Sequence, residues 1–371
     1  MTENRTKMST VTRTIIILLL AALALSACGK HSHTPDDSEQ PALIGFAPLS
    51  QDEMTKGEAN FPHIDFGVWG IARQSGFEDY ILWNPTAASP KMERVYLTEF
   101  GYIPENDAYW LGDYTYNFLA VAPYVGSADV ITSISAGNAS GKESLSFTFD
   151  MGEKYDPTTA EYDFDLMAAV AQNSVTGPAA THPSVQPLKF WHLLSQINLF
   201  VSFDSDLAGN PISGTLTGVR LCDLYTSARY TISSSPVPGE DPDEVELVVD
   251  YTAISTSKDD MEYSVPSPVA PDGTDPDEKP QFTFHIIPQS VKSLPLYIDF
   301  AINEGTEDEP KMVYYEDLKI NLNIPANADP YVNNGKYNWR IKIGTGTAIK
   351  FEVEVVDWVS DPLQPKDPIV M

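Results

Sequence analysis

Alternation of apolar and polar residues dominates the chain after about residue 42. From Tyr114 to Ala122 and from Leu145 to Met151, large apolar side chains fall on every second position. The same period of two recurs at residues 197–203, 282–286, 296–302 and 349–355. This period is typical of half-buried β-strands, whereas an amphipathic helix repeats its apolar residues every three to four positions. The pattern therefore predicts many short strands and few helices.

Turn residues separate the expected strands and suggest a division of the chain. Asn334 and Gly335 precede an alternating stretch that begins at Tyr337, and we expect a tight turn in which Gly335 has a positive φ. Residues 174–187 carry three prolines and few large apolar side chains, as a linker does. Each side is long enough to form its own core. We therefore expect an all-β protein with two tandem antiparallel β-sandwich domains, at residues 42–186 and 187–371.

The first 27 residues have the pattern of an export signal. Three basic residues precede an apolar run over residues 15–25. A membrane-spanning helix needs about 20 apolar residues, so this run is too short to span and typical of a secretory signal peptide. It ends in the sequence LSAC, which is similar to a bacterial lipobox, and we expect residues 1–27 to be removed and Cys28 to be lipidated. The alternative is an ordinary cleaved signal with a cysteine nearby.

Composition narrows the classes of partner. The chain has 52 Asp and Glu against 23 Lys and Arg, giving a formal charge of −29. Nucleic-acid binding and docking on anionic lipid both need basic surfaces, so neither is expected. Residues 28–41 are polar and acidic and suit a solvated tether. The other cysteine, Cys222, lies in an apolar stretch, where a buried thiol is expected.

Patterns that would indicate catalysis or a cofactor are weak. His192 and Ser195 lie three residues apart without an evident acid partner, which favours a structural role. Acidic loops at residues 239–244, 271–279 and 304–311 offer carboxylates for calcium but lack the ligand spacing of a known loop, so calcium stays an open alternative. We expect no enzyme activity and no cofactor. Four tryptophans offer a sugar-stacking platform, but their apolar neighbours favour the core; they are Trp69, Trp83, Trp110 and Trp191.

Several spaced patches resemble one family. They occur in a characteristic order between about residues 42 and 358, at 44–46, 54–57, 66–70, 116–123, 165–169, 187–194, 334–339 and 353–358. Through these patches the chain resembles the fimbrillin family, the lipoprotein-derived type V pilins of Bacteroides-type bacteria. The resemblance implies transthyretin-like sandwiches and a pilin that a trypsin-like protease cleaves after its first strand. A strand from the next subunit then fills the opened groove, which is a form of β-strand addition.

The resemblance also assigns residues to this mechanism. The removable strand corresponds to residues 42–48, and cleavage is expected at Lys56. Better-known members carry arginine at that position, so a lysine-cutting protease is implied here. The apolar contacts of the removable strand are expected to be Leu43, Ile44 and Phe46. The candidate donor strand lies at the C-terminus and includes Val353, Val355, Ile369 and Val370.

The function that the resemblance implies is a structural subunit of a cell-surface pilus of a Gram-negative bacterium, supporting adhesion. Its partners would be other pilin subunits, a lipid anchor in the outer membrane before processing, and surface or host ligands. The sequence does not distinguish a stalk, tip or anchor subunit. An alternative from another class is a lipid-anchored surface protein with a glycan-binding β-sandwich, which predicts an exposed aromatic platform.

Overall fold

The computed structural model describes most of the chain beyond residue 41. The described residues are 42–50, 64–83, 92–124, 131–139, 142–151, 165–176, 185–203, 214–241, 243–253, 259–269, 280, 282–303, 305, 309–324, 331–343 and 349–357. The expected signal peptide and the tether at residues 28–41 lie outside these ranges. No helix long and apolar enough to span a bilayer occurs in the described part of the chain.

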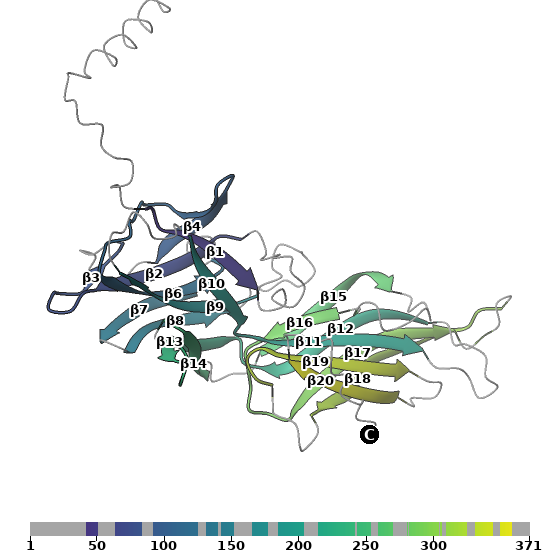
Figure 1. Ribbon diagram of the computed structural model, residues 1–371. Coiled ribbons are helices and arrows are strands. Elements are labelled where there is room, and N and C mark those ends of the chain that lie inside the picture. Colours follow the sequence, from purple (N-terminus) through teal and green to yellow (C-terminus); the bar gives the residue numbers. More distant parts are fainter. Residues whose placement is uncertain are drawn as a thin grey trace, which may run out of the picture. The chain divides into compact units, whose positions relative to one another are not determined.

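All regular elements of the described residues are strands (Figure 1). The first half contains β1 (Gly45–Ser50), β2 (Phe66–Arg73), β3 (Tyr80–Ile81), β4 (Glu93–Thr98), β5 (Gly101–Pro104), β6 (Tyr114–Ala122), β7 (Ile131–Ala139), β8 (Lys142–Asp150) and β9 (Met167–Val175). The second half contains β10 (Val185–His192), β11 (Ser195–Phe203), β12 (Gly214–Leu224), β13 (Ser227–Pro236), β14 (Val245–Ala253), β15 (Asp259–Val269), β16 (Phe282–Ile286), β17 (Ser293–Asn303), β18 (Met312–Asn323), β19 (Gly335–Ile343) and β20 (Ile349–Asp357). The predicted all-β class is confirmed.

The first large sheet closes on itself. Its strands follow the order β3-β2-β4-β5-β1-β10-β9-β6, and β6 also pairs with β2 over residues 115–121 and 67–73. This last pairing joins the two ends of the sheet, so β2, β4, β5, β1, β10, β9 and β6 form a barrel-like ring. Closure removes the exposed edges that an open sheet would present. A closed ring of this kind was not part of the β-sandwich expected for this half of the chain.

The strands β2, β6 and β9 are buried on both faces, which explains why their apolar residues run almost continuously. In β6, Tyr116, Phe118 and Ala120 belong to the core inside the barrel, together with Phe46 and Phe66. The residues between them, Leu119 and Val121, belong to a second core outside the barrel. Alternate residues of a strand point to opposite faces, so a strand with a core on each side has no polar face.

A four-stranded sheet in the order β14-β13-β8-β7 supplies the other side of that outer core. Its residues Leu145, Phe147 and Tyr230 are at most 1% exposed and lie in the same cluster as Leu119 and Val121. The rings of Phe147 and Tyr230 stack at 5.7 Å between centroids. The alternation predicted for residues 145–151 is therefore confirmed by a fully buried face.

Two further four-stranded sheets enclose the remaining core. Their orders are β16-β11-β19-β20 and β15-β12-β17-β18. Phe203 of β11 contacts Phe300 of β17 with ring centroids 6.3 Å apart, and a Cβ added at Gly214 of β12 would clash with the Phe203 ring. The two sheets therefore pack face to face around side chains such as Trp339, which is 0% exposed. Gly214 is needed because it lets the Phe203 ring lie directly on the backbone.

Two expectations about strand arrangement are corrected. The sheets are not wholly antiparallel, because β1 pairs with β10 in parallel and β11 pairs with β19 in parallel. The expected division between residues 186 and 187 falls inside β10, which belongs to the barrel. In addition, β13 pairs with β8 over residues 227–233 and 144–150. Strands from both sides of the expected division thus share sheets.

The turn before β19 is present, but a different residue has the positive φ. The N–H of Gly335 donates to the carbonyl of Val332 at 3.2 Å, and φ is +58° at Asn334. Asparagine tolerates this left-handed region better than most residues that carry a side chain. The expected assignment to Gly335 is therefore wrong by one position.

Buried tyrosines should make the fold sensitive to alkali. Burial raises the pKa of Tyr116 to about 12, and burial also raises the pKa of Tyr230 and Tyr331. An exposed tyrosine has a pKa of about 10, so above this pH the unfolded chain releases protons that the folded chain retains. The free energy of unfolding is therefore expected to fall as pH rises from about 10 to about 12.

Urea denaturation at about pH 8 and about pH 11 measures this dependence. In Tyr116→Phe the difference between the two pH values should shrink, whereas in Tyr314→Phe, at a side chain that is 70% exposed, it should not change. Equal unfolding free energies at both pH values in the wild-type chain would contradict the prediction.

Candidate functional site: the first strand and its aromatic seat

Strand β1 is an integral member of the barrel. It pairs in parallel with β10 over six residues, from Gly45 opposite Val185 to Ser50 opposite Phe190. On its other side it pairs with β5 in antiparallel orientation at one position, Phe46 opposite Tyr102. The first strand therefore lies between two strands that occur much later in the chain, and the ring depends on it for closure.

The side chains of β1 are seated on an aromatic cluster inside the barrel. Phe46 is 3% exposed and lies edge-on to Phe66 and Phe118, at centroid distances of 6.1 and 5.5 Å, with the Trp83 ring at 6.3 Å. We call Phe66, Trp83 and Phe118 the aromatic seat. Ile44 is 1% exposed in the same core. Burial of two such side chains contributes about 1.5–3 kcal/mol each.

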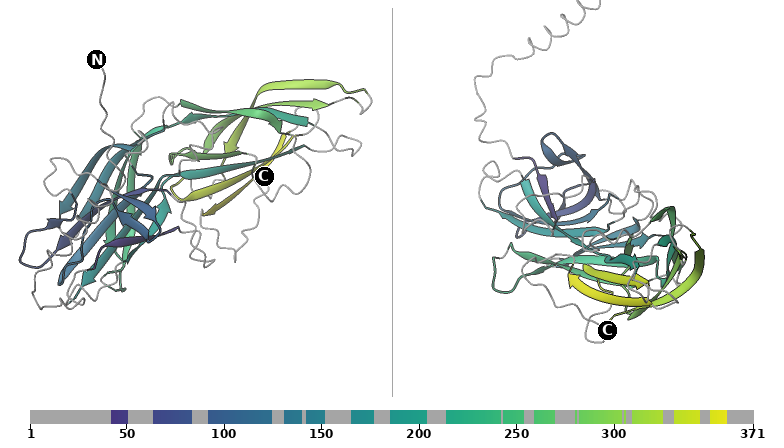
Figure 2. Two further views of the ribbon diagram at one scale, coloured as in Figure 1. Left: turned by 90° about the horizontal axis from the view of Figure 1, so that it is seen from above. Right: turned by 90° about the vertical axis from the view of Figure 1, so that its right-hand side faces the viewer.

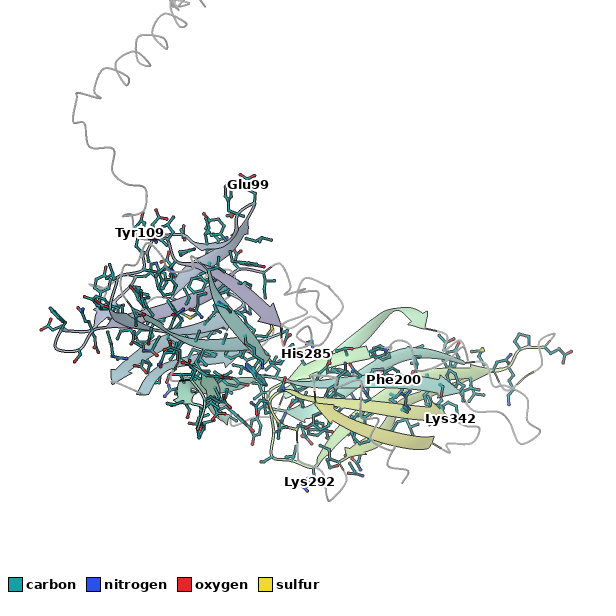
Figure 3. The ribbon with its side chains drawn as sticks, in the orientation of Figure 1. Glu99, Tyr109, Phe200, His285, Lys292 and Lys342 are labelled. Carbon is teal, nitrogen blue, oxygen red and sulfur yellow. The ribbon has the colours of Figure 1, made fainter. Side chains whose placement is uncertain are left out.

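Leu43 does not share this environment. It was expected to be a third apolar contact, but its side chain is 46% exposed. Leu43 forms an isolated bridge to Tyr109, which is labelled near the start of β1 in Figure 3. Adjacent residues of an extended chain point to opposite faces, so Leu43 and Ile44 cannot both point into the barrel. This part of the expected contact set is corrected.

The loop between β5 and β6 holds the segment that leads into β1. The Ile44 N–H donates to the Ala108 carbonyl at 2.9 Å, and the Trp110 N–H donates to the Ala42 carbonyl at 3.0 Å. Trp110 itself is fully buried, with its ring 4.7 Å from that of Tyr116. Two backbone hydrogen bonds and an anchored tryptophan thus fix the entry of β1.

A buried carboxylate fixes this loop in turn. The carboxylate of Glu93, 3% exposed, accepts hydrogen bonds from the backbone N–H of Asn106 at 2.5 Å and from its side-chain amide at 2.9 Å. Burial raises the pKa of Glu93, and the two hydrogen bonds from Asn106 oppose that rise. The indole N–H of Trp83 donates to the Asn106 carbonyl at 2.9 Å. The loop is therefore connected to the aromatic seat as well as to β1.

Sequence reasoning did not identify Glu93, Asn106 and Trp110 as part of the candidate site. Their distance along the chain from β1 left no local signal of this contact. The one available signal in the sequence was Trp110, which is followed closely by Tyr114 and Tyr116. Large aromatic residues at such a spacing indicate a buried segment just before β6.

The other expected site residues divide into two groups. Cys28, Lys56, Ile369 and Val370 lie outside the described residues. Val353 and Val355 lie in β20, opposite Trp339 and Tyr337 of β19. Both of these β19 side chains are 0% exposed. The part of the candidate donor that lies in β20 is therefore paired within its own chain.

Strand β20 occupies an edge of its sheet. The order β16-β11-β19-β20 leaves one side of β20 without a neighbour among the described strands, and β19 and β20 run side by side in Figure 2. An edge strand presents unpaired backbone donors and acceptors to the outside. The β20 backbone is thus connected to the fold through only one neighbouring strand of this sheet.

The weaker candidates have structural surroundings. The His192 Nδ1 lies 2.6 Å from a carboxylate oxygen of Asp165, and the Ser195 hydroxyl donates to the Val332 carbonyl at 2.6 Å. These two side chains thus contact different partners. Cys222 is buried and has no disulfide. Among the described residues, no cluster of three or more His, Cys, Asp or Glu side chains could hold a metal ion, and the acidic loop at 271–279 lies outside them.

The expected aromatic platform is not formed by the tryptophans. Trp69, Trp83 and Trp110 are at most 5% exposed. Trp191 is half-buried, with the Lys189 ammonium 4.5 Å from its ring centroid. The expectation that most of these side chains belong to the core is confirmed.

Comparison with known proteins gives a consistent result. A family model described as fimbrillin-like matches residues 66–358. A fimbrial protein from Bacteroides vulgatus ATCC 8482 has a solved structure that is 18% identical, with a TM-score of 0.53, covering 85% of this chain and 99% of that one. A candidate cell adhesion protein from Bacteroides uniformis ATCC 8492 is 14% identical, with a TM-score of 0.43, over 88% and 100% of the two chains. The first likeness indicates a shared fold. No curated protein sequence matches the chain significantly.

Proposed function

The chain belongs to the fimbrillin-like family, and on this premise we propose that it is a non-enzymatic structural subunit of a cell-surface pilus that supports adhesion. In this proposal the precursor is exported as a lipoprotein and held in the outer membrane through Cys28. Cleavage after Lys56 then releases β1, and a strand of another pilin subunit takes its place. The proposal does not depend on the expected division into domains at residues 42–186 and 187–371. It requires only that the barrel accept the strand of the other subunit.

The observation that carries the proposal is the position of β1. It is the first strand among the described residues, and with the residue before it this strand fills the ring through Ile44 and Phe46. Lys56, the expected cleavage site, follows Ser50, the last residue of β1, by six positions. Without β1, the aromatic seat and one side of both β10 and β5 would be exposed. A donor strand can restore both the apolar burial and the backbone hydrogen bonds.

The proposed donor is the C-terminal region, including Val353, Val355, Ile369 and Val370. Its support is the edge position of β20, which is paired on one side with β19. A head-to-tail contact between a donor at one end and an acceptor barrel does not close, so it propagates as a filament. Residues 57–371 contain 46 Asp and Glu against 18 Lys and Arg, a formal charge of −28. This charge keeps processed monomers apart at long range, so the joining contact must be short-range and apolar.

The N-termini of surface filaments test the processing step. Intact mass measurement of subunits from purified filaments is expected to show chains that begin at Gly57. Lys56→Gln should prevent cleavage and leave lipidated precursor without filaments, because the ring stays closed around β1. Lys91→Gln, at a lysine well beyond β1 in the sequence, is the matched control and should assemble normally.

Filaments whose subunits all retain lipidated Cys28 would contradict strand removal. Filaments of normal length from Lys56→Gln, with another new N-terminus, would contradict the cleavage position alone. A protein that never assembles but remains on the cell surface as a monomer would favour the glycan-binding alternative. Burial of Trp69, Trp83 and Trp110 weakens that alternative, because these side chains cannot form the exposed aromatic platform that it predicts.

A further inference from the structure

A polar pocket lies beside the hairpin that joins β2 to β3. Its volume is about 460 Å³, within the range of about 300–1,000 Å³ that is usual for small-molecule sites. Four strands contribute to it, since Arg73 ends β2, Asn117 lies in β6, Glu143 in β8 and Gln172 in β9. The strands thus supply one part of the lining, and the β2–β3 connection supplies the rest through Gln74, Ser75, Phe77 and Asp79.

The charges in this pocket are arranged around one arginine. The guanidinium of Arg73 forms ion pairs with Glu143 and, at 3.1 Å, with Asp79. The Arg73 side chain is 13% exposed and that of Glu143 is 3% exposed. The positive charge of Arg73 is therefore offset within the pocket by two carboxylates. An anionic ligand would meet a net negative site, and like charges in contact are unfavourable.

The remaining polar lining suits hydroxyl groups. Asn117, 5% exposed, and Gln172 each carry an amide that both donates and accepts hydrogen bonds. Thr115 adds a hydroxyl, which shares a hydrogen bond of 3.2 Å with the Ser174 hydroxyl and keeps capacity for a second one. A ligand with several neutral hydroxyl groups can use donors and acceptors at once. Partly buried amides of this kind fix the orientation of a ligand in a site.

An aromatic ring stands at the rim of the pocket. Phe77 lines the pocket and is 68% exposed. Its N–H donates to the Gln74 carbonyl at 3.1 Å, and Gly76 has φ of +84°, so a tight turn fixes the backbone at Phe77. The Arg73–Asp79 ion pair bridges the same hairpin. An exposed aromatic face beside polar groups suits a ligand with one apolar and one polar side.

We propose that this pocket binds a neutral pyranose sugar, with its apolar face on Phe77 and its hydroxyl groups at Asn117, Gln172 and Thr115. This inference goes beyond the proposed pilus role and does not rest on strand exchange, because a folded precursor already contains the pocket. The ligand class follows from the offset charge of Arg73, the two amides and the aromatic rim. It differs from the tryptophan platform considered above, since none of its lining residues is a tryptophan.

Calorimetric titration of the full precursor, produced without lipid, tests the proposal. The probes are methyl β-galactoside, methyl α-mannoside and N-acetylglucosamine, with glucuronate as the anionic comparison. At least one neutral probe should bind with a dissociation constant of about 10 mM or tighter. Glucuronate should bind more weakly than the neutral sugars.

Two variants localise the binding. Phe77→Ala removes the stacking face and should weaken binding about two- to tenfold. Gln172→Ala removes hydrogen bonds to the sugar and should weaken it by a similar factor. Phe100→Ala is the matched control, because Phe100 is 84% exposed but lies in the β4–β5 turn, next to the labelled Glu99 in Figure 3. Its affinity should equal that of the wild type.

Each contrary result overturns the proposal. Failure of all three neutral sugars to bind excludes the ligand class, and tighter binding of glucuronate would show that Arg73 is available to anions. Unchanged affinity in both Phe77→Ala and Gln172→Ala would place any binding elsewhere on the chain. Because the assay uses monomers, failure here would leave filament assembly untouched, and failure of assembly would leave sugar binding untouched.

Discussion

Replacing Phe46 by alanine is expected to lower the free energy of unfolding of the precursor by about 3–5 kcal/mol. The ring is 3% exposed and contacts all three members of the aromatic seat, so its removal leaves a cavity that β-strands of a closed ring cannot readily fill. Urea denaturation of the full precursor measures the change. This is the largest stability effect that we expect from one substitution in β1.

Leu43→Ala is the matched control. It also truncates an apolar side chain to alanine three residues earlier, with the loss of three carbon atoms instead of six, but at a position that is 46% exposed. The change should therefore stay within about 0.5 kcal/mol. Equal losses in the two variants would show that β1 is not seated as described. The same comparison also tests the proposed strand exchange. Once β1 has been cleaved away, filaments from the Phe46→Ala precursor should be as stable as wild-type filaments.

Deletion of residues 369–371 is expected to abolish filament formation while leaving the monomer folded. The tail lies outside the described residues, and the proposal gives Ile369 and Val370 to the donor strand. Circular dichroism and urea denaturation check the monomer, and electron microscopy after cleavage at Lys56 checks assembly. Normal filaments from the shortened chain would exclude the tail as the donor.

Introducing a charged side chain into β20 is a second test of the proposed donor strand. Val355→Asp places a carboxylate opposite Tyr337, which is 0% exposed, whereas Val356→Asp places one opposite the half-exposed Lys336. We expect Val355→Asp to stop assembly and Val356→Asp to preserve it. If the Val355→Asp monomer itself unfolds, then β20 serves the monomer's own core, and the donor must lie in the tail beyond it.

Local alternation was sufficient to predict the strands but not their partners. The stretches 114–122, 145–151 and 349–355 became β6, β8 and β20 because a period of two is a property of the segment itself. Pairing of β1 with β10 joins residues about 140 positions apart, and no local pattern encodes it. The continuous apolar run in β2 was not recognised as a sign of burial on both faces, and this pattern alone does not distinguish a closed ring from a covered sheet.

The candidate site was predictable to a similar extent. Ile44 and Phe46 have the spacing of a single strand face, and both are buried. Leu43 was assigned to the same contact set because it is apolar. Its position next to Ile44 places it on the opposite face of an extended chain. The Pro-rich segment before residue 187 suggested a linker, yet β10 begins at Val185 and carries the partner edge for β1. Proline composition describes the loop and gives no information about the strand that follows it.

The ring position of β1 also sets how many neighbours a subunit can accept. Adjacent strands in a sheet lie about 4.8 Å apart, so loss of β1 leaves a space between β10 and β5 that is one strand wide. Once the first donor had bound, a second donor would find no free backbone edge between β10 and β5. Under the proposed exchange each subunit therefore receives one strand and gives one. Because one missing strand admits one donor, we expect the polymer to be a chain without branches.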